Sequence, residues 1–258
     1  MYQVHSIKAF RDNYIWALTN KKNNYCAIVD PGDAEAVIKF LKTHNLVLTE
    51  ILITHHHPDH IGGVKILAER FPECSIYGPN TARFSSFSKG VNAGEEIKLK
   101  AINGMLSVIE LTGHTKDHIG YIDNQSAFVG DTLFSIGCGR LFEGTAEQMF
   151  DSLSQLKKMN DAISVYCAHE YTLANLSFAL AVTPDEKALL EYQQEVEEKL
   201  NADLTSIPTT IRREKLLNPF LRTDNEKIKS SIQQKFDLQA RPDDKKTFEL
   251  LRKWKDNF

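Results

Sequence analysis

Hydrophobic and polar positions follow one pattern through most of this chain and a different one towards its C-terminal end. Up to about residue 170, apolar residues rich in β-branched and aromatic types come in short runs, separated by polar, glycine or proline residues. Such runs are typical of β-strands. After about Tyr171, apolar residues recur at helical spacing, as in Leu189, Tyr192, Val196 and Leu200. The pattern predicts a mixed α/β part followed by a smaller helical part.

Two pairs of the predicted strands form hairpins, 14–20 with 24–30, and 118–123 with 126–131. Further strands are predicted at 50–55, 74–78, 95–102, 106–112 and 163–169, and helices at 34–44, 61–71 and 145–159. Thr145 stands at the N-cap of the last of these helices, and Gln148 completes a capping box. In the helical part, the segments 189–200, 228–236 and 248–254 carry the helical spacing.

The composition narrows the class of protein. The 258 residues are 42% hydrophobic and 25% charged, which is typical of a globular chain. A net charge of −3 gives no general attraction to nucleic acid or anionic membranes. We find no secretory signal and no apolar run long enough to span a bilayer. The four cysteines form no C-x-x-C pair, so we expect reduced thiols and a cytoplasmic location.

The segment THHHPDHIGG, from Thr54 to Gly63, concentrates four histidines directly after the apolar run ILI. Because side chains alternate along an extended segment, His55 and His57 should point one way and His56 the other. Pro58 then turns the chain, so that Asp59 and His60 lie nearby but displaced. This spacing suits two adjacent metal ions better than one. The alternative to a metal site is a surface histidine run without function. This alternative is disfavoured because α/β folds place their functional sites at the ends of strands.

Such a site needs further ligands, and three other strand ends offer them. His114 follows the strand LSVIEL, Asp131 follows SAFVG, and His169 follows ISVY. Each residue alone could equally be a turn residue, an N-cap or a satisfied polar group. Together with the histidine cluster, they predict a two-metal hydrolytic site.

These residues give the sequence a resemblance to the metallo-β-lactamase superfamily. Within it, the chain is similar to the glyoxalase II family of hydroxyacylglutathione hydrolases, through THHHPDHIGG, TGHTKDHIGY, GDTLFSIGCGRLFEGT and CAHEYTLANLSFAL. The similarity continues through NPFLRT to LRKWKDNF and so covers essentially the whole chain. It implies an α/β fold, with an αββα metallo-β-lactamase-type sandwich at 1–170 as the catalytic domain. A smaller all-helical domain at 171–258 would contribute to the glutathione site.

The resemblance also implies which residues hold which ion. His55, His57 and His114 would hold one metal, Asp59, His60 and His169 the second, and Asp131 would bridge both along with a water or hydroxide. Asp59 and Asp131 would be the catalytic carboxylates, acting with metal-bound hydroxide. Two divalent ions per chain are expected. Zinc is the first choice and iron or manganese are alternatives, because nitrogen and oxygen ligands suit all three.

The activity implied is hydrolysis of S-(2-hydroxyacyl)glutathione, with S-D-lactoylglutathione as the expected substrate, as in methylglyoxal detoxification. For glutathione binding the resemblance points to Arg140, Tyr171, Arg212 and Lys215. Some family members have Lys in place of Arg140 and Tyr in place of Phe142. Arginine still binds a carboxylate, but Phe142 cannot donate a hydrogen bond. The expected partner is this small molecule, with no nucleic acid, no membrane and a monomeric chain.

Three other functions remain open on the same residues. An iron-dependent glutathione persulfide dioxygenase shares the metal ligands, but such proteins generally lack the helical C-terminal part. A phosphodiesterase or nuclease shares H-x-H-x-D-H but usually has a basic substrate surface, which a net charge of −3 does not favour. A binding protein with a decayed site is disfavoured because all seven ligand positions are intact.

Overall fold

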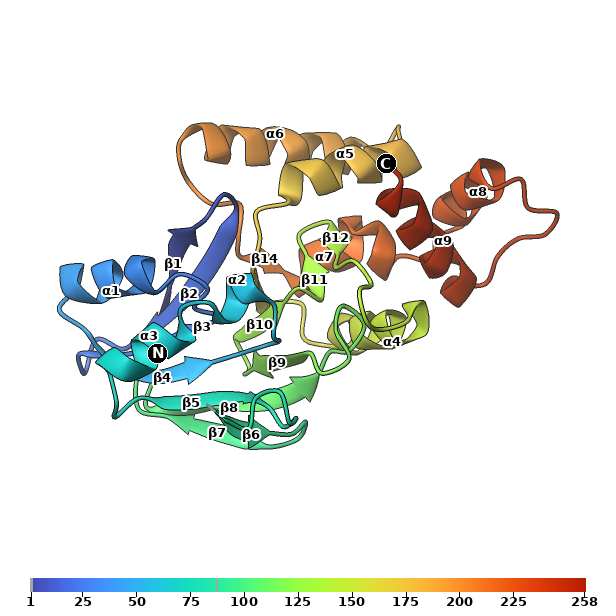
Figure 1. Ribbon diagram of the computed structural model, residues 1–258. Helices are drawn as coiled ribbons and strands as arrows, with labels where there is room; N and C mark the ends of the chain where they lie inside the picture. Colours follow the sequence, from blue (N-terminus) through green and yellow to red (C-terminus); the bar gives the residue numbers. More distant parts are fainter. Residues whose placement is uncertain (1, 87) are drawn as a thin grey trace. The chain divides into compact units, whose positions relative to one another are not determined.

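The computed structural model describes residues 2–86 and 88–258, which form two compact units (Figure 1). The first unit comprises the described residues of Met1–Glu110 together with Asp117–Gly130. The second comprises Leu111–Lys116 together with Asp131–Phe258. Each unit is built around its own core, and each contains some of the site residues predicted from the sequence.

The first sheet of the first unit has the order β1-β2-β3-β4-β5-β6. Its strands are β1 (Gln3–Ala9), β2 (Asn13–Thr19), β3 (Tyr25–Val29), β4 (Val47–Leu52), β5 (Ser75–Pro79) and β6 (Lys89–Val91). Neighbours are antiparallel from β1 to β3 and parallel from β3 to β6. The predicted hairpin of 14–20 with 24–30 is therefore confirmed. Helix α1 (Ala34–Thr43) makes the crossover that parallel β3 and β4 require. Its buried residues Val37 and Leu41 belong to the same core cluster as Ile28 and Ile51.

A second, antiparallel layer contains β7 (Glu96–Leu99), β8 (Gly104–Glu110), β9 (Ile119–Ile122) and β10 (Ser126–Gly130). The hairpin predicted at 118–123 and 126–131 is thus present as β9 and β10. Tyr121 of β9 is fully buried, and its hydroxyl donates to the carbonyl of Ile53, just beyond β4 in the first sheet, at 2.8 Å. This hydrogen bond joins the two sheets of the unit face to face.

The helix predicted at 61–71 is wrong in its extent. The structure has two short helices instead, α2 (Pro58–Ile61) and α3 (Val64–Arg70), with the break at Gly62 and Gly63. A Cβ on Gly63 would come within 2.6 Å of the Pro31 carbonyl oxygen and the Ala34 amide nitrogen. The close approach of the chain at the start of α1 therefore requires glycine here and separates the two helices.

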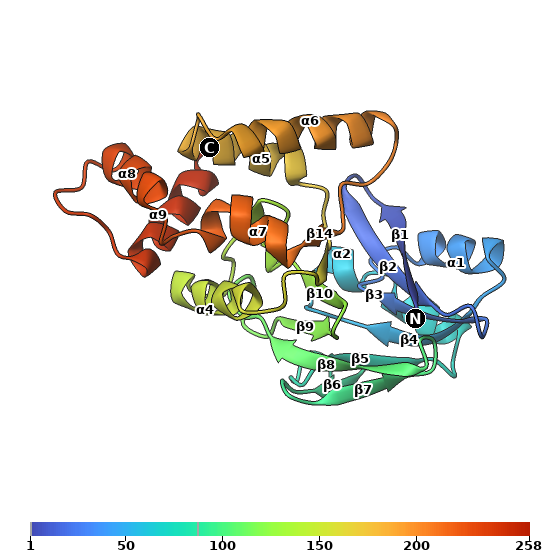
Figure 2. The same ribbon diagram turned by 180° about the vertical axis from the view of Figure 1, so that it is seen from behind.

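The second unit is mainly helical, with the small hairpin of β11 (Leu133–Phe134) and β12 (Gly137–Cys138) and the pair β13 (Ser164–Cys167) and β14 (Thr209–Thr210). Its helices are α4 (Ala146–Lys157), α5 (Thr172–Val182), α6 (Lys187–Asn201), α7 (Ile211–Leu217), α8 (Glu226–Lys235) and α9 (Asp244–Asp256), with a 3-10 turn at Pro219–Leu221. Both views show α5 and α6 lying side by side (Figures 1 and 2). The predicted capping box of Thr145 and Gln148 is confirmed by both of its hydrogen bonds, at 2.9 and 3.2 Å.

Two further expectations concern the whole of the described chain. Over residues 2–86 and 88–258, no helix combines the length and hydrophobicity needed to cross a membrane. All four cysteines are free thiols. Burial raises the pKa of both Cys26 and Cys74 to about 12, so these thiols are poor nucleophiles at neutral pH.

Candidate active site

The histidine cluster of the first unit is fixed by Asp30, a buried residue at the end of β3. Its carboxylate accepts hydrogen bonds from the Thr54 amide at 2.8 Å, the Thr54 hydroxyl at 2.7 Å and Nδ1 of His60 at 3.0 Å. Because a carboxylate only accepts, Nδ1 of His60 carries the proton, and Nε2 has the lone pair that a metal requires. Asp30 thus selects the tautomer of His60.

His55 is prepared in the same way through Thr54. The Thr54 hydroxyl donates its only hydrogen to Asp30, so its oxygen must be the acceptor in the contact with His55. Nδ1 of His55 therefore donates to this oxygen, at 3.0 Å. Nε2 of His55 is left with the lone pair, and it lies 3.1 Å from Nδ1 of His57. Two imidazole nitrogens therefore converge, which suits a shared cation. His56 points elsewhere, with Nδ1 at 3.5 Å from Asp117, as strand alternation predicted.

Asp59 and His60 form a second pair of candidate metal ligands in the first unit. An oxygen of Asp59 lies 3.5 Å from Nε2 of His60 and accepts a hydrogen bond from the Asn13 side chain at 2.9 Å. His118, fully buried, stacks its ring on that of His55 at a centroid distance of 4.7 Å. Stacking with His118 thus orients the ring of His55, and the hydrogen bond from Asn13 orients the carboxylate of Asp59.

In the second unit, Asp131 lies between two histidines. Its Oδ2 atom is 3.4 Å from Nε2 of His114 and 3.4 Å from Nε2 of His169. Nδ1 of His114 donates to the Arg140 carbonyl at 2.7 Å, so Nε2 again has the lone pair. The ring of His169 is stacked on Tyr171, with centroids 4.7 Å apart and planes 5° from parallel. One carboxylate shared by two imidazoles is the arrangement expected of a bridging ligand.

Glycine at position 139 allows this arrangement. A Cβ there would overlap the carbonyl oxygen of Asp131 and approach Nδ1 of His114 to 3.2 Å. We therefore expect Gly139→Ala to lower the free energy of unfolding by about 1–3 kcal/mol, as overpacking typically does, and to weaken metal binding. Denaturant titration and elemental analysis measure the two effects. Gly104→Ala, whose Cβ meets nothing closer than 3.6 Å, is the control and should leave metal content unchanged.

A cavity of about 350 Å³ in the second unit adjoins Asp131 and His114. Its lining also includes the predicted substrate residues Arg140 and Tyr171, together with Phe134, Cys138, Phe142, Ala174, Asn175, Arg252 and Lys255. Phe142 is exposed and contacts the His114 ring edge-on at 5.2 Å, so it contributes an apolar surface to the cavity. Three cations line one cavity beside two candidate ligands, which suits a substrate carrying carboxylates.

Arg252 and Lys255 of α9 were not predicted from the sequence. Arg252 is buried and donates to the Cys138 carbonyl at 2.9 Å, and it pairs with Asp256 at 3.0 Å. Lys255 donates to Oδ1 of Asn175, and burial together with the Arg252 charge lowers its pKa to about 8. Burial raises the pKa of the Cys138 thiol, although the Arg252 charge opposes the rise.

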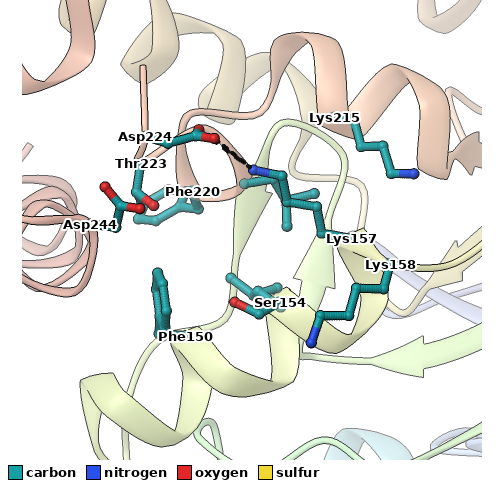
Figure 3. A pocket seen from close by; sticks show the side chains of 11 residues that line it. Phe150, Ser154, Lys157, Lys158, Lys215, Phe220, Thr223, Asp224 and Asp244 are labelled. Atoms are coloured by element: carbon teal, nitrogen blue, oxygen red, sulfur yellow. Dashed lines mark hydrogen bonds and ion pairs between the residues drawn. The ribbon is translucent and has the colours of Figure 1, made fainter. Parts of the chain in front are cut away.

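Two predicted glutathione residues lie outside this cavity. Lys215 lines a different cavity, of about 520 Å³, with Lys157 and Lys158, where Figure 3 shows the three side chains. Its ammonium donates to Asp161 at 2.6 Å and to the Met159 carbonyl at 3.0 Å. Arg212 is exposed and lines a third cavity, with Arg213 and Arg222. The assignment of Arg212 and Lys215 to glutathione stays a prediction.

Known proteins resemble the chain over its full length. The model of the metallo-beta-lactamase superfamily matches residues 11–169, and that of the hydroxyacylglutathione hydrolase C-terminus matches residues 170–258. Hydroxyacylglutathione hydrolase of Aliivibrio salmonicida (strain LFI1238) is 48% identical, and that of Vibrio campbellii (strain ATCC BAA-1116) is 45% identical, each over 258 residues covering 100% of both chains. Among solved structures, ETHE1 from Myxococcus xanthus has a TM-score of 0.64 at 23% identity, covering 99% of this chain and 98% of that chain.

The donor set of each unit fits a divalent metal. Imidazole nitrogens with tautomers set by Asp30, Thr54 and the Arg140 carbonyl stand beside carboxylates, and this mixture suits zinc, iron or manganese. The expected α/β fold and the helical C-terminal part agree with the two family models. The chain belongs to the metallo-beta-lactamase superfamily and, within it, to the hydroxyacylglutathione hydrolase family of enzymes.

Proposed function

We propose that the protein hydrolyses S-(2-hydroxyacyl)glutathione, with S-D-lactoylglutathione as its principal substrate, to glutathione and D-lactate. The observation that carries the proposal is the cavity of the second unit, which combines the candidate ligands His114 and Asp131 with the cations of Arg140 and Lys255. Its size of about 350 Å³ lies in the range of small-molecule sites. The names and full-length similarity of the relatives support the same substrate.

We further propose that the chain binds two divalent ions, zinc in the first place, with iron or manganese as alternatives. His55, His57 and His114 would hold one ion, Asp59, His60 and His169 the other, and Asp131 both. When bound, such ions would supply Lewis acidity, which lowers the pKa of a coordinated water to roughly 7 and can polarise a carbonyl group. Asp59 and Asp131 are the proposed catalytic carboxylates, because each lies beside a histidine whose lone pair is available.

The remaining residues of the site bind and orient the substrate. Arg140 and Lys255 would pair with the carboxylates of glutathione, and Tyr171 would offer its hydroxyl and ring next to His169. The thiol of glutathione has a pKa of about 8.5, so it can depart as a thiolate. The chain therefore needs no separate general acid, and the contribution of these substrate-binding residues is placement of the thioester.

The lowered pKa of Lys255 predicts a pH dependence of substrate binding. With a pKa of about 8, below its usual value of 10.5, the side chain is charged below that pH and loses its charge as the pH rises through 8. We expect kcat/KM to fall above pH 8 because KM rises. Lys255→Arg should remove this fall, whereas Lys255→Ala should raise KM about tenfold or more at pH 7, since loss of one partner of a charge pair costs about 2 kcal/mol or more. An unchanged KM in Lys255→Ala would refute the assignment.

The first test of the proposed function is the loss of thioester absorbance with S-D-lactoylglutathione, alongside elemental analysis of the same sample. Hydrolysis by a protein that contains close to two metal ions per chain would support it. Metal without thioester hydrolysis would overturn the proposed substrate. Oxygen consumption with glutathione persulfide and hydrolysis of phosphodiesters would then test the alternatives, which the match of residues 170–258 to a hydrolase model does not favour.

The proposal extends to the domain division, location, oligomeric state and partners of the chain. A catalytic domain at 1–170 would be followed by a helical domain at 171–258, which supplies Lys255 and Tyr171 to the glutathione site. We propose a cytoplasmic, monomeric protein that binds neither nucleic acid nor membrane. Size-exclusion chromatography with light scattering tests the monomer directly.

A further inference from the structure

The hairpin of β11 and β12 connects two residues of the proposed site, Asp131 and Arg140. Phe134 and Cys138 of this hairpin line the substrate cavity themselves. Ile136 stands at its tip with a φ of +60°, in the left-handed region. A β-branched residue in this region is strained, and it persists only when its surroundings hold it in place. Something in the second unit must therefore hold the tip of the hairpin.

Glu214 of α7 provides the first hold. Its side chain is fully buried, and Oε2 accepts a hydrogen bond from the Ile136 amide at 2.9 Å. The same oxygen accepts from the Asn218 side chain at 2.8 Å, and Oε1 accepts from the Thr209 hydroxyl at 2.7 Å. The strained residue is thus bonded to a carboxylate that β14 and the end of α7 also hold.

The carbonyl groups of the hairpin are held from three helices. Asn218, at the C-cap of α7, donates to the Gly137 carbonyl at 3.0 Å, and Asn175 of α5 donates to the Ser135 carbonyl at 2.8 Å. Arg252 of α9 donates to the Cys138 carbonyl at 2.9 Å. Asn175 also accepts from Lys255, so the same network reaches a cation of the substrate cavity.

We propose that Glu214 and Asn218 are positioning residues, which hold the β11–β12 hairpin so that the substrate cavity keeps the shape that binds glutathione. Neither residue lines that cavity, so each acts through the hairpin. The inference rests on the proposed function for its substrate, but the hydrogen bonds of the hairpin can be measured without substrate.

Glutamine and alanine at position 214 separate hydrogen bonding from charge. In Glu214→Gln, the amide oxygen can still accept from Ile136 and Asn218, while the amide nitrogen donates to the Thr209 hydroxyl, which can also accept. The network survives without its charge. In Glu214→Ala, the Ile136 amide and the Asn218 side chain lose their acceptor inside a buried site.

The experiment compares KM, kcat, metal content and amide hydrogen exchange of residues 133–138 in these variants, well below their melting temperatures. Glu214→Ala should raise KM about tenfold or more, keep its metal, and exchange the hairpin amides at least about tenfold faster. Glu214→Gln should stay within about threefold of the unaltered protein. Glu50→Ala is the matched control, because Glu50 is also buried and accepts from the amides of Lys100 and Ala101 in the first unit.

A purely structural role would give a different result. Glu214→Ala would then lower the melting temperature as Glu50→Ala does, with KM and hairpin exchange unchanged, and the inference would be overturned. If the unaltered protein hydrolyses no glutathione thioester, the proposed function fails, and hairpin exchange alone decides the inference. Unchanged exchange in Glu214→Ala would reject it whatever the activity.

Discussion

Replacing Asp131 with asparagine is expected to lower kcat/KM for S-D-lactoylglutathione by about a thousandfold. The substitution keeps the size of the side chain but removes its charge and turns one oxygen into an amide nitrogen. Oδ2 of Asp131 lies 3.4 Å from Nε2 of both His114 and His169. An amide nitrogen in that place would donate to the lone pairs that should bind metal. The loss of several kcal/mol of Lewis-acid stabilisation corresponds to about three powers of ten in rate.

Steady-state kinetics and elemental analysis of the same preparation check this prediction. We expect metal content to fall together with activity, because Asp131 is proposed to serve both ions. Asp224→Asn is the matched control, since Asp224 is an exposed carboxylate whose partner is Lys157 at 3.4 Å. The control should keep full activity and metal. Normal activity and normal metal content in Asp131→Asn would remove it from the site.

Removal of metal by a chelator is expected to abolish hydrolysis and to lower the melting temperature. Hydrogen bonds to Thr54, Asp30 and the Arg140 carbonyl hold the proton of each imidazole on Nδ1 in His55, His60 and His114. Nε2 of each ring then keeps the lone pair that binds a metal. A metal that binds only the folded chain stabilises it, by about 4 kcal/mol at a thousandfold excess over Kd. Its loss should therefore appear in thermal unfolding as well as in rate.

Dialysis against a chelator, followed by the addition of zinc, iron or manganese one at a time, makes this measurement. Each ion that restores both activity and melting temperature is a candidate for the native metal. A sample that is metal-free by elemental analysis, yet retains thioester hydrolysis at the initial rate, would exclude a metal-dependent reaction.

The sequence predicted those parts of the site that depend on local pattern. His55 and His57 come together because side chains two residues apart in extended chain share a side, and this alternation is visible in the sequence. The role of Asp30 was missed because it arises from tertiary structure. Asp30 directly follows β3, and Thr54 and His60 follow β4. The parallel pairing of those two strands brings the three residues together.

Helical periodicity likewise predicted where helices lie, but not which of their polar side chains line the site. Phe248, Leu251 and Trp254 predicted α9, but the pattern indicated no role for Arg252 and Lys255 of the same helix, which line the cavity. Helix α5 was missed because apolar residues surround its axis on most sides and leave no period to detect. The β11–β12 hairpin has strands too short to show a pattern, and its conformation depends on Glu214, far along the chain.

The burial of Cys138 has a consequence for the chemical durability of the enzyme. A thiolate can attack the carbonyl carbon of a thioester and take over its acyl group, while the original thiol leaves as a thiolate. Cys138 lines the cavity in which the thioester is proposed to bind, but burial raises the pKa of its thiol and keeps it protonated. We therefore expect Cys138 to resist acylation by the proposed substrate over repeated turnovers.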